Sequence, residues 1–170
     1  MCPLRITKCI QWSKWLVSAF WFVGIALGYC LATIVPDVSI AMVNQISRQE
    51  PSVVGLLFST VTPLLIAFFA VKLRKRFALL TVLLIKAFSF SFCAVCVLLA
   101  FNDAGWLLYR FYLFSNSCST VVLTWFCFRY INGDHTDLLK HFLYCILTVF
   151  LILLIDIILV APFVWTLFNN

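Results

Sequence analysis

Long apolar runs separated by short polar segments form the main pattern along the chain. Each run is long enough to cross a bilayer as an α-helix, because a helix rises about 1.5 Å per residue and the hydrocarbon core is about 30 Å thick. The pattern predicts an all-α, polytopic membrane helix bundle that forms a single domain, residues 1–170. The five expected transmembrane helices cover residues 15–35, 53–71, 77–101, 106–128 and 138–168.

One dense cluster of charge sets the orientation of these helices. Lys72, Arg74, Lys75 and Arg76 lie between the second and third apolar runs. Cations are not tolerated in hydrocarbon, so this cluster is expected in a short loop in water. The excess of Lys and Arg places that loop in the cytoplasm. Five helices then put the N-terminus in the cytoplasm and the C-terminus outside.

The remaining polar segments agree with this orientation. Residues 1–14 are basic, and residues 129–140 form a second expected cytoplasmic loop. Residues 36–52 and 102–105 are the expected outside loops. The first apolar run has the charged start of a signal peptide, but its length and bulky side chains favour a helix that is not cleaved.

The composition supports the assignment to membrane proteins and indicates which kinds of partner are expected. The chain is 65% hydrophobic and only 11% charged, whereas soluble domains carry about 25% charged residues. Too few polar residues are present to cover a soluble globule. The net charge of +6 is explained by topology and by contact with anionic lipid headgroups, so membrane lipids are expected partners and nucleic acid is not.

Ionisable residues inside the apolar runs are the candidate functional residues, because each needs a partner or a role. Arg110 and Asp156 lie in the outer halves of their helices and are expected to form an ion pair, although Arg110 also has the reach to extend to the headgroups. Lys86 lies about 15 Å from the cytoplasmic end of its helix, at the depth of Asn116, which is able to accept a hydrogen bond from it. A structural contact is favoured for Lys86 over a transport role, a proton relay or an interface with a partner protein.

Pro63 interrupts the second expected helix near its middle. Proline has no backbone N–H, so one carbonyl of the preceding turn loses its helical donor. The helix is therefore expected to kink unless a neighbouring group satisfies this carbonyl.

The eight cysteines lie mostly in apolar runs, where a thiol behaves as a small hydrophobic group. Cys93 and Cys96 form the one motif typical of redox chemistry. A membrane thiol oxidoreductase would need a second cysteine pair in an outside loop, and the expected outside loops contain none. No Cys/His spacing indicates a zinc site, and no Ser/His/Asp set shares a depth. The sequence therefore predicts no catalytic residues, cofactor or metal.

Three further features of the chain lie within its expected helices. A cation precedes a small-aromatic run at Lys86-Ala87-Phe88-Ser89-Phe90-Ser91-Phe92. A polar break occurs at Phe114-Ser115-Asn116, and Asp156 precedes Pro162 in the last expected helix. In these features the chain resembles the stage II sporulation protein M family, over about residues 10–168.

The resemblance implies a membrane scaffold without catalytic residues in a bacterial plasma membrane. Such a scaffold holds peptidoglycan-degrading partners, the stage II sporulation proteins D and P, during engulfment of the forespore. The docking surfaces would be loop 36–52 and residues 165–170, and Lys86 would be able to pair with an acid of a partner helix.

Two other functions remain open on the residues themselves. The first is a small transporter or permease subunit with a path lined by Lys86, Asn116 and Asp156. The second is a thiol oxidoreductase that uses Cys93 and Cys96.

Overall fold

The computed structural model describes residues 3–37, 53–101, 114–131 and 137–160, and all regular structure in these ranges is helical. No strand occurs in them, so the predicted all-α fold is confirmed. The final α-helix continues directly into a π-helical turn. The elements are α1 (Pro3–Ile34), α3 (Val53–Lys72), α4 (Arg76–Phe101), α6 (Phe114–Tyr130), α7 (Leu138–Ile155) and η2 (Asp156–Val160).

Three of the helices contain a segment that is long and apolar enough to cross a membrane. These segments are Trp15–Ile34, Arg76–Leu99 and Leu138–Ile158, and α3 contains a shorter apolar segment, Leu57–Lys72. Helices suit this environment because they satisfy every backbone polar group internally. The findings support a helical membrane protein, whereas the count of five crossings and the sidedness stay predictions.

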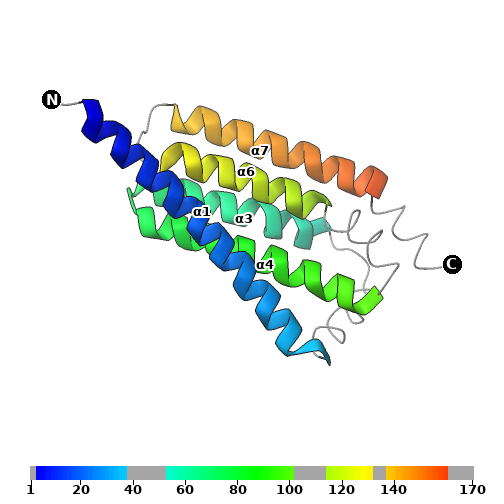
Figure 1. Cartoon of the computed structure of the whole chain (residues 1–170). Helices are drawn as coiled ribbons and strands as arrows, with labels where there is room; N and C mark the ends of the chain where they lie inside the picture. The colour runs from blue at the N-terminus through cyan, green and yellow to red at the C-terminus, as the bar shows by residue number, and fades with distance from the viewer. Residues whose placement is uncertain (1–2, 38–52, 102–113, 132–136, 161–170) are drawn as a thin grey trace.

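In the described part of the chain, α3, α4, α6 and α7 form an up-and-down bundle, and α1 lies across it. In Figure 1, α3, α4, α6 and α7 alternate in direction, and α1 crosses the others diagonally. The main neighbour of α1 is α4, whereas α3, α6 and α7 contact one another. As a result, the starts of α1, α4 and α7 lie at the same end of the bundle as the ends of α3 and α6.

Several predicted features lie outside the described residues. They are Arg110, most of the loop 36–52, the turn 102–105, the start of the fourth helix and the end of the fifth. The first helix is longer than predicted at its N-terminal end. It was expected from residue 15, whereas α1 is helical from Pro3 and its apolar crossing segment begins at Trp15.

Aromatic side chains fill the core between α3, α6 and α7. The rings of Phe68 and Phe142 lie 4.2 Å apart, and those of Phe126 and Tyr130 lie 4.9 Å apart. The buried Tyr130 hydroxyl also lies 2.7 Å from Nδ1 of His141, which joins α6 to α7. Large apolar side chains cover the outer faces of the helices, as expected for a surface in contact with lipid acyl chains.

The turn between α3 and α4 carries the charge cluster that sets the predicted orientation. The amide of Arg74 donates to the Val71 carbonyl at 2.9 Å, and the amide of Lys75 donates to the Ala70 carbonyl at 2.8 Å. This pair of bonds is a Schellman motif, which requires a left-handed residue where the helix ends. Arg74 occupies that position with φ 56°, although glycine is the usual residue there.

Candidate functional site: a polar junction inside the bundle

Lys86 joins three helices near the middle of α4. Its Nζ donates one hydrogen bond to Oδ1 of Asn116 on α6 at 2.6 Å and another to the Ser59 carbonyl oxygen on α3 at 3.2 Å. The Lys86 side chain is only 7% exposed. The predicted hydrogen bond between Lys86 and Asn116 is thus confirmed. We call this group, formed by Lys86, Asn116 and the Ser59 carbonyl, the polar junction.

The Ser59 carbonyl is available to Lys86 because of Pro63. In an α-helix the amide of a residue donates to the carbonyl four positions earlier, and Pro63 has no amide hydrogen to donate to Ser59. Lys86 on the neighbouring helix supplies the missing donor. The sequence predicted that a neighbouring group would be needed here, and the structure identifies that group as an ammonium.

Hydroxyl groups of α6 hold the other side of the junction. The Asn116 backbone carbonyl accepts hydrogen bonds from Ser119 Oγ at 3.0 Å and from Thr120 Oγ1 at 2.7 Å. These bonds satisfy the hydroxyls of Ser119 and Thr120. The side-chain oxygen Oδ1 of Asn116 faces Lys86. Burial of an ammonium is costly unless it is hydrogen-bonded. In the described part of the chain, no buried side-chain nitrogen or oxygen lacks a partner.

Asp156 occupies a different place, where α7 changes to a π-helix. Its side chain is 6% exposed and lies close enough to the Cys118 thiol of α6 to interact with it electrostatically. Its amide donates to the carbonyls of Ile152 and Leu153, four and three positions earlier. The predicted ion pair with Arg110 is untested, because Arg110 lies outside the described residues.

Comparison of the chain with models of protein families, with curated proteins and with solved structures gave no match. The resemblance to the stage II sporulation protein M family is thus carried only by the residues named above, and it stays a prediction.

The contact between α1 and α4 was not among the predicted sites. A Cβ atom added at Gly24 would lie 2.7 Å from the Leu84 carbonyl oxygen, and one added at Gly28 would lie 2.5 Å from that of Phe88. The two helix backbones therefore touch with no room for a side chain. We call this contact the glycine interface. The available signal was the spacing Gly24-x-x-x-Gly28, which is typical of close helix pairs in membranes.

One hydrogen bond crosses the glycine interface. Ser91 Oγ on α4 donates to the Ile25 carbonyl oxygen on α1 at 2.9 Å. Ala32 continues the buried stripe of α1 four residues beyond Gly28. Small residues on both helices thus allow the approach.

The thiols of Cys93 and Cys96 lie in different surroundings although they are one helical turn apart. Cys93 is exposed, Cys96 is buried, and both are free thiols in the structure. The role of this pair in a thiol oxidoreductase stays a prediction. Among the described residues, no group of three or more His, Cys, Asp or Glu side chains is placed to hold a metal ion.

Proposed function

We propose that this protein is a non-enzymatic integral membrane scaffold or accessory subunit, with five crossings and a cytoplasmic N-terminus. The charge distribution supports this orientation. Lys72, Arg74, Lys75 and Arg76 are all exposed at one end of the bundle, where Arg129 and Lys140 are exposed as well. Such an excess of cations is typical of the cytoplasmic end of a membrane protein.

The observation that carries the scaffold proposal is the engagement of Lys86 within its own chain. Two hydrogen bonds direct its charge to α3 and α6, so the ammonium holds three helices in a fixed arrangement. A fixed bundle is what a scaffold needs in order to present partner sites at a constant separation. The resemblance suggests cell-wall hydrolases as partners, with loop 36–52 and residues 165–170 as the docking surfaces.

The test is purification of the tagged protein from its native membrane in a gentle detergent, followed by mass spectrometry. We expect hydrolases in stoichiometric amounts with the wild type and with Ala26→Leu, an exposed position of α1. Lys86→Met should lower both partner recovery and thermal stability. Recovery of the protein alone from wild-type membranes would contradict the proposal.

A small transporter or permease subunit is the second candidate, and the π-helical turn at Asp156 favours it. Short π-helical segments are frequent at functional sites, and this one, which follows directly on α7, begins with a buried acid. Asp156→Asn keeps the shape of the side chain and removes its charge. A transporter that uses this acid would lose proton flux into dye-loaded proteoliposomes without a change in unfolding temperature. A scaffold would keep its partners in the same variant.

A further inference from the structure

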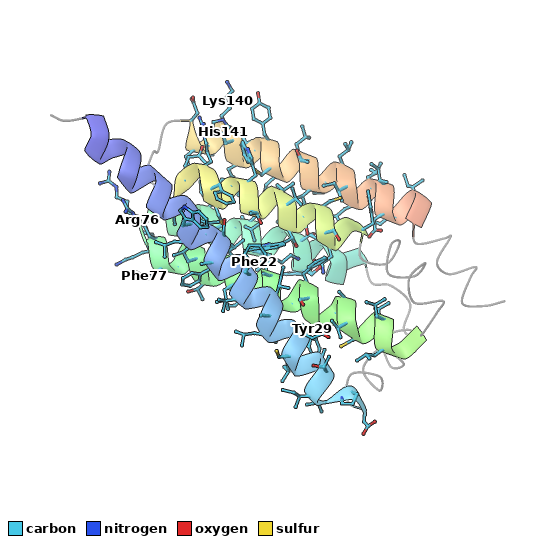
Figure 2. The ribbon with its side chains drawn as sticks, in the orientation of Figure 1. Phe22, Tyr29, Arg76, Phe77, Lys140 and His141 are labelled. Carbon is cyan, nitrogen blue, oxygen red and sulfur yellow. The ribbon has the colours of Figure 1, made fainter. Side chains whose placement is uncertain are left out.

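The turn between α3 and α4 combines exposed cations with exposed apolar side chains. Lys72, Arg74, Lys75 and Arg76 are exposed, and we call these four residues the basic turn. The large apolar side chain that follows directly, Phe77, is 82% exposed. Figure 2 shows Arg76 and Phe77 together at the start of α4. Leu73, within the turn, is exposed as well.

Arg74 occupies a position that favours glycine. Its left-handed backbone, with φ 56°, is strained for any residue with a Cβ atom. The Schellman bonds of the turn would form equally well with glycine. The charged side chain of Arg74 therefore adds nothing to the backbone geometry of the turn, which indicates a role for the charge itself.

We propose that the basic turn binds the phosphate of an anionic phospholipid headgroup, and that Leu73 and Phe77 contact the part of the acyl chains nearest to the headgroup. The turn joins two apolar helices, so it lies where headgroups meet hydrocarbon. Clustered cations beside a membrane helix attract anionic lipids. An exposed phenylalanine next to Arg76 suits the apolar part of a lipid and has no use in the binding of free phosphate.

Other charges at this end are placed on different helices. Arg129 lies in the last turn of α6, and Lys140 and Asp137 lie at the start of α7. Figure 2 shows Lys140 across the end of the bundle from Arg76. Lys140→Gln is therefore a matched control, since it removes one exposed cation from the same end without altering the basic turn.

The test is native mass spectrometry of the purified protein after equilibration in mixed vesicles of phosphatidylglycerol and phosphatidylcholine. The wild type should retain phosphatidylglycerol in preference. Arg74→Gly and Lys75→Gln should each weaken this retention by about fivefold, because each removes one of the clustered cations that would contact the lipid phosphate. Phe77→Ala should weaken it too, whereas Lys140→Gln and an excess of inorganic phosphate should leave it unchanged.

Two results would overturn the inference. Equal losses in Lys140→Gln and Lys75→Gln would show diffuse attraction to the whole end of the bundle. Displacement by inorganic phosphate, with Phe77→Ala unchanged, would show an anion site that does not recognise lipid. Arg74→Gly should also raise the unfolding temperature because it removes the strain, which separates a loss of lipid from a loss of fold. The measurement uses purified protein, so it is independent of partner proteins and of the scaffold proposal.

Discussion

The two contacts of α4 hold neighbouring helices in opposite ways. On one side, the glycine interface brings the backbones of α1 and α4 together because Gly24 and Gly28 have no side chains. On the other side, the polar junction uses one long side chain, Lys86, to reach both α3 and α6. Lipid chains are as apolar as the helix surfaces, so helices in a membrane are held by close packing and by hydrogen bonds. In this chain close packing dominates at the glycine interface, which one hydrogen bond also crosses, and hydrogen bonds dominate at the polar junction.

The comparison predicts opposite sensitivities to mutation. The glycine interface should fail when atoms are added, because the neighbouring atoms are backbone atoms and the Cβ atoms of Ala87 and Ser91, which cannot move aside without a shift of the helix. The polar junction should fail when atoms are removed, because the hydrogen bonds of the buried Lys86 ammonium to α3 and α6 are then lost. Substitutions of each kind, at matched positions, are able to separate the two mechanisms.

The largest effect is expected for Gly28→Leu. A Cβ at this position would meet the Phe88 carbonyl oxygen at 2.5 Å and the Phe92 amide nitrogen at 2.9 Å, so α1 has to separate from α4. We expect a loss of about 4 kcal/mol in the free energy of unfolding, measured by titration with sodium dodecyl sulfate in mixed micelles. Ala26→Leu, on an exposed face of the same helix, is the control and should change it by less than about 0.5 kcal/mol. Equal stability of the two variants would mean that α1 does not dock through its glycines.

Lys86→Met should have the next largest effect. The substitution keeps most of the side-chain volume but leaves Asn116 Oδ1 and the Ser59 carbonyl without this donor. We expect a loss of about 3 kcal/mol in the same titration, because each hydrogen bond to a charged group contributes about 1.5–3 kcal/mol and release of the buried charge offsets part of the loss of two such bonds. Lys72→Met, at an exposed position, should be nearly neutral. A stable Lys86→Met variant with reduced flux would instead support the transporter.

The polar junction was largely predictable from the sequence, and the glycine interface was not. A cation in an apolar run needs a partner, and helix rise alone places Lys86 and Asn116 at one depth. Pro63 likewise predicts that the carbonyl four positions earlier lacks its helical donor. In contrast, Gly24 and Gly28 become informative only when the face of α1 that meets α4 is known. That choice depends on tertiary packing, as does the register shift that makes η2 π-helical at Asp156.

A smaller effect tests the link between Lys86 and Pro63. Pro63→Ala restores a backbone amide that is able to donate to the Ser59 carbonyl, so Lys86→Met should cost less in this background. We expect a coupling of about 1 kcal/mol in a double-mutant cycle followed by the same titration. The parallel cycle of Pro63→Ala with Lys72→Met should show none. If both cycles are additive, the hydrogen bond between Lys86 and Ser59 contributes nothing to stability.

Ser91→Ala should have the smallest effect, although it removes the hydrogen bond that joins α4 to α1. The Ile25 carbonyl lies inside α1 and keeps its helical donor, so no acceptor is left unsatisfied. We expect a loss of about 0.6 kcal/mol, the usual size for such bonds between membrane helices. Ser91→Leu should cost several times more, because Ser91 packs directly against Gly28. The space between them is too small even for a Cβ on Gly28, which would lie 3.0 Å from the Cβ of Ser91, so a leucine side chain would not fit. If the alanine variant were the less stable of the two, the hydrogen bond rather than the close approach would hold α1 in place.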